Sequence, residues 1–552
     1  MSKITKYMAI IALILFGNAC DFLDQVPYSI SSPENSYKDE NDFKIALAGC
    51  YEVINAMFIS DGSNISGGTY SQGLQYFLEG CSDNVIGTTA SATLMSMLRA
   101  DYNTESQDVN SFWKAFFTGI SRCNYLIDRA PKGELTPEQQ IQFTAEARFL
   151  RAFYYNHLAS LFGGLPYCVE PAVDPRLPRE NLEKIYSLII SDLKYAYENH
   201  SEEKILKCSI DKWGAGAYLG MVYNYLASCK RYNVGVTLLD RCPLNSFAWV
   251  DADATSLAAK TVLEDVVNNC PYILVDASEY KKLFYEMSKN TQYKECLLMS
   301  EWSSKNTSDA RTVYTVLAPA GSVTVRGTWQ RMFPTMRLYK SYTEGDIRRD
   351  MFITGMYTTS PAPQQETVDG YVYYIPRPSS GTSNNSSYQL FSTGKFRISD
   401  QGSGSMLLQS QCAMNDPLIR FADVILHYAE ALYFTGNEPL ARQQFIPIRD
   451  RIKGTLSIED ITAAYKRDDF VEELLEERGR ELCFEAKRRI DLMRFGKMTS
   501  TIETLPEEGT LNLRTGIQLL KNNWSEYKIW YPVPQIQIEV NSNFVQNAGY
   551  AD

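Results

Sequence analysis

The densest group of residues that could do chemistry is the stretch RGRELCFEAKRRIDLMRFG, from Arg478 to Gly496. Its charged side chains could form a nucleic-acid-binding patch, an acid/base site, or ion pairs that support the fold. The chain carries a formal net charge of −11, which argues against a polyanionic partner such as nucleic acid. Nothing in the stretch singles out one carboxylate as catalytic, so we favour the structural interpretation.

The spacing of apolar residues predicts one helix over 471–496. Apolar residues recur every three or four positions from Val471 to Met493, which is typical of one face of an amphipathic helix. Arg478 falls on that face, so it should lie at the edge or have a carboxylate partner. Gly496 is placed to end the helix. Two pairs of opposite charge have the favourable i to i+4 spacing, Glu476 with Arg480 and Glu485 with Arg489.

Little else in the sequence points to catalysis. There are three histidines, His157, His200 and His427, which leaves little material for histidine-based chemistry. No serine-hydrolase elbow, zinc-protease motif, phosphate-binding loop or CxxC pair occurs. We therefore expect no metal and no cofactor. The two carboxylates of a glycoside hydrolase need only meet in space, so that alternative stays open.

The first nineteen residues resemble an export signal. Lys3 and Lys6 precede a short apolar run, MAIIALILF, which is too short to span a bilayer. Ala19 then precedes Cys20, so we expect cleavage before Cys20, acylation of its thiol, and a lipidated tether over 20–40. An ordinary signal peptide cut nearby is the alternative. With Cys20 set aside, eleven of the twelve cysteines remain, an odd number, and we expect few disulfides.

The rest of the chain divides at about residue 270 into a helical part and a more varied part. Hydrophobic residues make up 45% of the chain, enough for a large core. We expect a mainly α fold with an N-terminal helical-repeat region over 41–270 and a C-terminal region over 271–552. The predicted helices of the first region are 41–58, 110–130, 136–164, 181–200, 211–228 and 252–269. In the second we expect a loop-rich segment over 271–415 with a strand at 295–302, repeat helices over 416–498 (416–436, 438–452 and 471–496), and an extended tail over 499–552.

Two local patterns support helical repeats. Leu219, Gly220 and Tyr223 have the spacing of a tetratricopeptide first helix, although the period is not strict. Gly214, Gly216 and Gly220 come near a dinucleotide-binding loop, but they are misspaced and lie inside a helical pattern. Close packing of helices explains these glycines better.

Several segments together resemble the SusD/RagB family of Bacteroidetes surface lipoproteins. The matching stretches are CDFLDQVP from Cys20, AEARFLRAFYYNHLASLFGGLPY from Ala145, LIRFADVILHYAEAL from Leu418, ERGRELCFEAKRRIDLMRFGK from Glu477 and YPVPQIQIEVNSNFVQNAGY from Tyr531. Their order and spacing agree with the family as well as their composition. The sequence departs from it at Arg489-Ile490, where an aromatic residue is common, and in its loose lipidation motif.

The resemblance implies a fold, a role and partners. The fold is a tetratricopeptide-like scaffold of four helix pairs with a loop-rich, strand-poor half that holds the ligand. The role is non-catalytic capture of a nutrient, usually a glycan, at the outer membrane beside a SusC-like TonB-dependent transporter. Peptide ligands are the alternative within the family, and a glycoside hydrolase is the weaker one outside it.

Glycan binding would use aromatic side chains that stack on sugar faces, together with polar groups that bind hydroxyls. Aromatic residues in loops are therefore the candidates, with Trp302 and Trp329 foremost because sites in the family draw on this region. The further candidates are Tyr314, Tyr70, Tyr76, Tyr102, Asp83, Asn84 and Arg99.

Overall fold

The computed structural model describes residues 37–550 except 56–68, 88–92, 173, 208, 303–313, 322–331, 359–362, 380–390 and 401–411. Within these ranges helices predominate, and the strands form small sheets of two or three strands. One continuous apolar core runs through both regions of the chain, from Phe43 to Ala548. The predicted mainly α fold class is confirmed.

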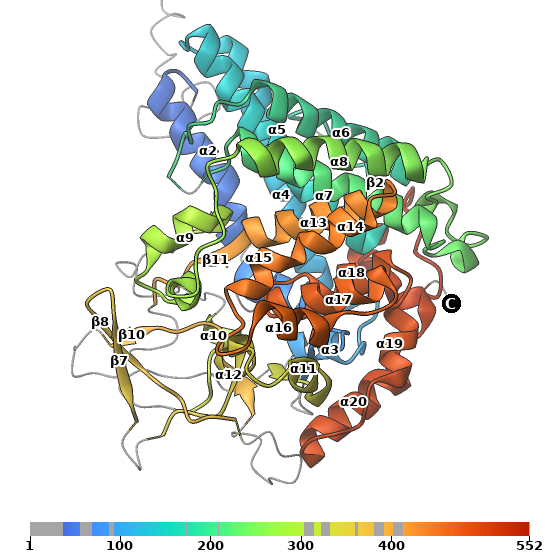
Figure 1. Cartoon of the computed structure of the whole chain (residues 1–552). Coiled ribbons are helices and arrows are strands. Elements are labelled where there is room, and N and C mark those ends of the chain that lie inside the picture. The colour runs from blue at the N-terminus through green and yellow to red at the C-terminus, as the bar shows by residue number, and fades with distance from the viewer. Residues whose placement is uncertain are drawn as a thin grey trace, which may run out of the picture.

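The N-terminal region is a series of long helices in which each packs against the next along the chain (Figure 1). These helices are α2 (Glu40–Asn55), α4 (Gln107–Arg129), α5 (Pro137–Phe162), α6 (Leu182–Asn199), α7 (Lys212–Arg231) and α8 (Ala252–Asn269). Side chains at their first turns fix where they start. Thr136 forms a capping box with Gln139 at α5, and Asp211 accepts from the Gly214 amide at α7. At α2 the cap is Asp39, whose carboxylate accepts from the amides of Asn41 and Asp42.

Glycines in α7 allow the neighbouring helices to approach closely, as expected. A Cβ atom at Gly220 would lie 2.4 Å from Leu263 of α8, and one at Gly216 would lie 2.7 Å from Tyr197 of α6. Any side chain at either position would therefore force Leu263 or Tyr197 to shift. This confirms the packing interpretation of the glycine pattern.

The predicted helix over 416–436 is shorter than expected, because its first residues form a strand. β11 (Asp416–Arg420) pairs antiparallel with β4 (Cys296–Ser300), and α13 (Phe421–Phe434) follows directly. The predicted strand at 295–302 is thus confirmed as β4, and its pairing explains why 416–420 is extended. α13 packs against α7 and α8 and so joins the two regions. The predicted helix over 438–452 is two short helices, α14 (Glu438–Gln443) and α15 (Phe445–Asp450).

The prediction of a single helix over 471–496 is wrong. The stretch forms α17 (Phe470–Glu481) and α18 (Arg488–Arg494), joined by a turn in which Phe484 and Ala486 have positive φ. Glu79, from the π-helix η1 (Thr69–Glu79), stabilises the turn, because its buried carboxylate accepts from the amides of Phe484 (3.0 Å) and Lys487 (3.2 Å). Apolar spacing continues through the break because the turn itself is buried.

The loop-rich segment has short elements beside the helical scaffold. Its largest described sheet has the order β10-β8-β7, made of β7 (Gln365–Val368), β8 (Tyr371–Tyr374) and β10 (Ser399–Asp400). Figure 1 shows this sheet at one edge of the molecule, away from α5 to α8. The segment also contains three short helices, α9 (Lys289–Glu295), α11 (Met336–Ser341) and α12 (Ile347–Phe352). Of these, α11 packs against α17, and Arg348 of α12 binds Glu477 of α17.

The expected extended tail over 499–552 also needs correction, because it contains helices. These are α19 (Met498–Thr504), α20 (Leu511–Asn523) and α21 (Gln535–Val540). The prolines of YPVP, at 531–534, favour extended chain. α20 comes before them in the sequence, and its buried residues Leu513, Ile517 and Leu520 recur with a helical period. The stretch from Tyr531 is anchored on α5, where its amide donates to the Leu161 carbonyl at 2.7 Å.

Candidate functional site

Most of the predicted ligand contacts near the N-terminal helices lie in the interior. Tyr76 and Asn84 have no exposed surface, and Tyr102 and Arg99 are also buried. Tyr102 donates its hydroxyl to the Lys528 carbonyl at 3.1 Å. These contacts hold the N-terminal region against the C-terminal tail. Because these four candidate side chains are buried, the structure gives no support to a role for them in binding a ligand at the surface.

Asp83 is also buried, and two arginines occupy its carboxylate. Arg488 binds it at 2.7 Å and Arg337 at 3.1 Å. Burial alone would raise the pKa of Asp83, but Arg337 and Arg488 hold it well below its usual value. Asp83 lines a groove of about 350 Å³ with Glu476, which pairs with Arg337. Four charged side chains of this groove, Asp83, Arg337, Glu476 and Arg488, are thus committed to ion pairs with one another.

Trp302 lies at the end of β4, where the structure leaves it half-buried. Its amide donates to Asn415 Oδ1 at 3.2 Å, and its carbonyl accepts from Lys289 Nζ at 2.9 Å. The backbone is therefore fixed from two sides. Its indole nitrogen is shielded and has no hydrogen-bond partner among the described residues, which is unusual for a tryptophan.

For the three remaining aromatic candidates, Trp329, Tyr314 and Tyr70, the structure does not describe the side chains. Trp329 lies outside the described residues. Tyr314 is the first residue of α10 (Tyr314–Leu317) and Tyr70 belongs to η1, and the side chains of both lie outside the described part.

A groove that the sequence did not indicate lies between α4 and the C-terminal tail. We call it the aromatic groove; it has a volume of about 370 Å³, within the roughly 300–1,000 Å³ of small-molecule sites. Trp113 and Phe117 of α4 pack against each other one turn apart, with tilted rings whose centres are 5.0 Å apart, and Phe544 packs edge-on against Trp113. Its polar lining consists of Lys114, Thr118, Ser121, Asp174, Gln537 and Asn541. The sequence signal for this groove was the pair of aromatic residues at i and i+4, Trp113 and Phe117. Phe544 could not be assigned to the groove from the sequence, because it is distant along the chain.

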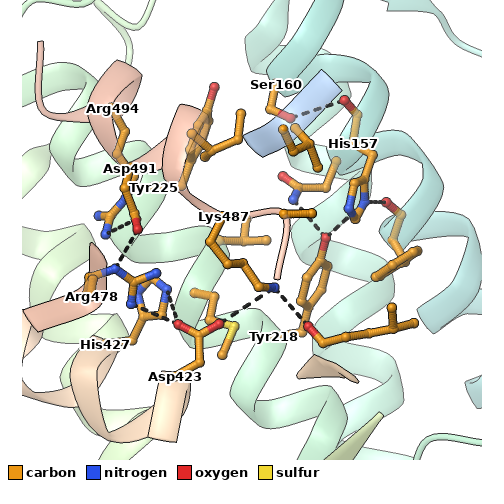
Figure 2. Close-up of a pocket in the computed structure, with 18 residues that line it drawn as sticks. His157, Ser160, Tyr218, Tyr225, Asp423, His427, Arg478, Lys487, Asp491 and Arg494 are labelled. Atoms are coloured by element: carbon orange, nitrogen blue, oxygen red, sulfur yellow. Dashed lines mark hydrogen bonds and ion pairs between the residues drawn. The ribbon is translucent and has the colours of Figure 1, made fainter. Parts of the chain in front are cut away.

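A second cavity, enclosed by α5, α7, α13 and α18, brings many polar groups together (Figure 2). Its volume is about 90 Å³, enough for a few water molecules but below the size of ligand sites. Its charges are paired: Arg478 binds Asp423 and Asp491, each at 2.8 Å. The prediction that Arg478, on an apolar helix face, has a carboxylate partner is therefore confirmed. Burial lowers the pKa of His157 to about 4, so the ring is neutral at physiological pH.

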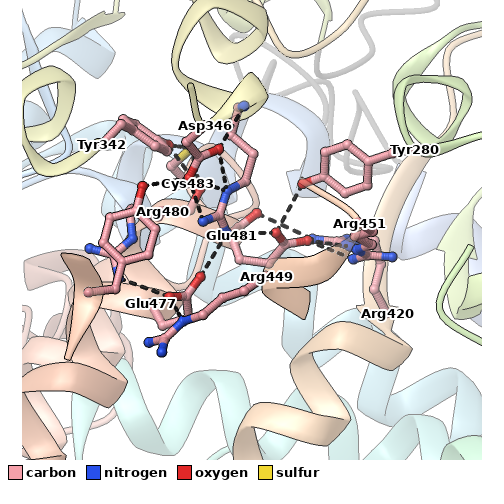
Figure 3. Close-up of polar contacts among 12 residues, drawn as sticks. Tyr280, Tyr342, Asp346, Arg420, Arg449, Arg451, Glu477, Arg480, Glu481 and Cys483 are labelled. Carbon is pink, nitrogen blue, oxygen red and sulfur yellow. Dashed lines mark hydrogen bonds and ion pairs between the residues drawn. The ribbon is translucent and has the colours of Figure 1, made fainter. Parts of the chain in front are cut away.

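The carboxylates of α17 form the centre of a buried ion network (Figure 3). Glu477 and Glu481 are completely buried, and both bind Arg348. Burial alone would raise the pKa of Glu481, but Arg451, Arg420 and Arg348 together lower it to about 2. A general acid for glycoside hydrolysis needs a raised pKa and contact with substrate. These carboxylates have neither property, so the charged stretch of the sequence is scaffold.

The expected ion pairs of that stretch are realised only in part. Arg480 lies 3.8 Å from Glu476, as predicted. Glu485 and Arg489 do not pair, because the turn between α17 and α18 separates them. Glu485 instead binds Arg420, while Arg489 donates to the Lys528 carbonyl at 2.6 Å.

Two further properties bear on the class of protein. Among the described residues, no group of three or more His, Cys, Asp or Glu side chains is arranged to hold a metal ion. In the same part of the chain, every helix is too short or too polar to cross a bilayer.

Comparison with known proteins places this architecture in a family. The model of the SusD family matches residues 303–550, and a second model, described as starch-binding and associating with the outer membrane, matches residues 21–224. SusD-like protein P25 of Formosa agariphila is 28% identical over 35% of this chain and 37% of its own length. SusD-like protein P2 of the same organism is 23% identical over 89% of this chain and 90% of its own length.

The fold agrees over nearly the whole chain with a solved structure, a laminarin-binding SusD-like protein. The TM-score is 0.67 at 21% identity, and the match covers 93% of this chain and 100% of the other. Models of the SusD family and of a SusD-like family thus match successive parts of the sequence, and the fold agrees with that of a solved SusD-like protein. The chain belongs to the SusD family.

Proposed function

We propose that the protein binds an oligo- or polysaccharide nutrient at the cell surface, without turning it over, and delivers it to a SusC-like TonB-dependent transporter. The observation that carries the proposal is the match of residues 21–224 to the family described as starch-binding and associating with the outer membrane. The laminarin-binding protein of the same fold supports a glycan as the ligand class.

The geometry of the carboxylates supports binding without catalysis. The carboxylates most densely grouped in the sequence are neutralised by arginines and removed from solvent. In the described part of the chain, no group of side chains is arranged to hold a metal ion that could take over a catalytic role from these carboxylates. We therefore propose that the protein is not an enzyme.

Within this function, we propose that Trp302 and Trp329 form part of the ligand platform. Trp302 has a rigid backbone, a half-buried ring and a shielded indole nitrogen without a partner among the described residues. A fixed aromatic face loses little side-chain entropy when a sugar stacks on it. The aromatic groove between α4 and the tail is the competing location, because it also combines rings with amides and hydroxyls.

We further propose that Cys20 carries a lipid and holds the mature protein on the outer membrane. The basic residues, the short apolar run and the Ala19-Cys20 pair support this proposal. The transporter partner is supported by family membership alone. Nucleic acid is not expected as a partner, given the net charge of −11.

The experiment that tests the function is a titration-calorimetry screen of the purified chain against polysaccharides and against peptides. We expect binding to at least one polysaccharide, in the roughly micromolar to millimolar range that corresponds to about −8 to −4 kcal/mol. Binding to peptides alone would establish the alternative ligand class. Each polysaccharide that binds is then incubated with the protein, and new reducing ends are measured. Their appearance would show hydrolysis and contradict the proposal.

A further inference from the structure

His427 joins the two regions of the chain from inside the cavity of Figure 2. It belongs to α13, its side chain is buried, and it contacts Asn224 of α7. The side-chain amide nitrogen of Asn224 donates to the His427 carbonyl at 2.8 Å and lies 3.3 Å from Nδ1 of the ring. One turn further along α7, Ser228 donates its hydroxyl to Glu430 of α13 at 2.9 Å. These contacts attach the C-terminal region to the helical repeats.

The hydrogen-bond partners assign a different neutral form to each histidine of this cavity. An amide nitrogen can only donate, so Nδ1 of His427 accepts from Asn224 and the ring proton lies on Nε2. His157 is the opposite case, because its Nδ1 lies 2.8 Å from the Phe153 carbonyl, which can only accept. Nδ1 of His157 therefore carries the proton. The contact between His427 and Asn224 thus requires a neutral His427 ring.

The charged groups around His427 leave no counter-charge for a proton on its ring. Nε2 lies 3.5 Å from Asp423, and Nδ1 lies 3.7 Å from Glu430. Arginines already hold both carboxylates, because Arg478 binds Asp423 and Arg494 binds Glu430, each at 2.8 Å. In the described part of the chain, the charged groups that line this cavity or contact the ring are three cations and three carboxylates, Arg478, Lys487, Arg494, Asp423, Glu430 and Asp491. These charges balance only while the ring is neutral.

The pKa of His427 agrees with this geometry. Burial, followed by the charges of Arg478 and Arg494, lowers it well below its usual value. Burial also lowers the pKa of the other imidazole of the cavity and raises those of its two phenols, so these groups are neutral as well: His157, Tyr218 and Tyr225. No neighbouring titration therefore supplies the missing negative charge.

We propose that His427 is a pH-sensitive joint, which holds α13 on α7 while its ring is neutral and releases this contact when Nδ1 takes up a proton. With a hydrogen on Nδ1, the Asn224 amide faces a donor instead of an acceptor. The buried cavity then also carries one positive charge without a partner, which is costly. Mild acid thus loosens the docking of the C-terminal region on the helical repeats. The joint needs neither a ligand nor a transporter, so it is independent of the proposed function.

The direction of the pH dependence follows from the two states of the joint. A histidine exposed by opening has the usual pKa of about 6.5, whereas the docked ring has a lower one. Well above pH 6.5 neither state binds the proton, so the docking is fully present. As pH falls below that value, only the open state takes up the proton, and its population grows. The ratio of open to docked molecules then rises by up to about 25-fold from pH 7 to pH 5.

Hydrogen exchange measures this ratio directly. Amides of α7 and α13 are followed in the full chain at pH 7 and pH 5, and each rate is divided by that of an unstructured peptide at the same pH. We expect opening of wild type to rise by about ten- to 25-fold in these two helices. His427→Asn keeps an acceptor close to the position of Nδ1 but cannot titrate, so its opening should stay constant.

Ser228→Ala is the matched control. It removes the neighbouring hydrogen bond between the same two helices without changing a histidine. This variant should open more than wild type at both pH values and keep the wild-type ratio between them. The same rise in His427→Asn as in wild type, or no rise in wild type, overturns the proposal.

A measurement on wild type alone keeps the test valid if the variant does not fold. The chain has three histidines, so selective nitrogen-15 labelling gives few ring signals, and their chemical shifts in nuclear magnetic resonance distinguish the two neutral forms. We expect the proton on Nε2 in His427 and on Nδ1 in His157 at pH 7. Both rings should stay neutral at pH 5, where a histidine with the usual pKa is almost fully protonated.

His200 is the positive control for this spectrum. Burial alone would lower its pKa, but the neighbouring Glu146 raises it, so its ring should be charged at pH 5. A charged His427 ring in the folded chain at pH 5, or a proton on its Nδ1 at pH 7, contradicts the joint.

Discussion

Arg348 and Glu481 join the loop-rich segment to the helical scaffold through a completely buried ion pair. Arg348 Nη1 lies 3.0 Å from Glu481 Oε2, and neither side chain is exposed. Arg348 belongs to α12 and Glu481 ends α17, so the pair connects parts of the chain that the sequence places far apart. Arg420 and Arg451 bind the same carboxylate at 3.2 and 2.9 Å. The pair is thus the centre of a network rather than an isolated contact.

Replacing Glu481 with Gln should destabilise the fold strongly. The change leaves three buried arginines short of a counter-charge, and breaking a buried ion pair costs about 3–5 kcal/mol. Chemical denaturation followed by circular dichroism measures this cost. Asp450→Asn is the control, because Asp450 pairs with Lys453 at the surface, where such pairs are worth at most about 1 kcal/mol. Equal losses in the two variants would contradict the central role of the network.

The same carboxylate predicts how stability depends on pH. Its pKa is lowered from 4.5 to about 2 in the folded state, so its contribution is present above the unfolded value and is lost as pH falls from about 5 to 2. The free energy of unfolding of wild type should therefore decrease across this window. Glu481→Gln should show a shallower decrease, because the titrating group is gone. An identical pH profile in the two proteins would show that Glu481 does not contribute to acid sensitivity.

The turn between α17 and α18 offers a contrasting pair of substitutions. Leu482 is 2% exposed, so Leu482→Ala should cost about 2–5 kcal/mol. Lys487 is partly buried and donates to the Leu418 carbonyl at 2.8 Å. Its removal leaves that carbonyl without this donor, so we expect Lys487→Ala to cost about 1–3 kcal/mol. A loss of glycan affinity by Lys487→Ala at unchanged melting temperature would contradict the scaffold role of this helix pair.

Local signals in the sequence predicted most of the helical scaffold. Thr136, Asn181 and Asp211 marked helix starts that the structure confirms, because a capping side chain acts on amides within the next turn. The turn after α17 was missed, because the group that satisfies its amides, Glu79, comes from the other end of the chain. β11 was missed for the same reason, since only its pairing with β4 makes it extended.

Candidate sites are harder to predict from local sequence patterns. An aromatic residue in a predicted loop looks the same whether its ring faces solvent or the core. Tyr76 and Tyr102 are of the second kind, because both are buried, and Tyr531 of the C-terminal tail packs against Tyr102. The aromatic groove depends on Phe544 reaching α4, a contact between distant segments with no local pattern. Pairing of this kind is decided by the tertiary fold.

Membrane attachment through Cys20 predicts a change in fractionation. Cys20→Ala removes the thiol that would be acylated, so the protein should move from the outer-membrane fraction to soluble fractions. Cell fractionation with immunoblotting measures this shift. Binding to the transporter could also retain the protein, so the variant should be examined in a strain that lacks the transporter. Full retention at the surface in that strain would show that the lipid does not hold the protein.

The location of the ligand site is tested by tryptophan substitutions. We expect Trp302→Ala, Trp329→Ala or both to weaken glycan binding at least about tenfold, equivalent to about 1.4 kcal/mol, because each removes a flat apolar face on which a sugar ring can stack. Titration calorimetry with the polysaccharide found by the screen measures the loss. An unchanged circular dichroism spectrum must accompany it, since Trp302 also packs beside β4.

Two further variants make this test decisive. Trp249→Ala removes a half-buried tryptophan of the helical scaffold whose indole donates to the Ser246 carbonyl, and it should leave binding unchanged. Phe117→Ala removes a half-buried ring of the aromatic groove while Trp113 stays in place. If Trp302→Ala and Trp329→Ala bind like wild type and Phe117→Ala does not, the ligand lies between α4 and the tail. That outcome would move the site without changing the class of ligand. If all three variants bind like wild type, both proposed locations are wrong, and the receptor must use other residues.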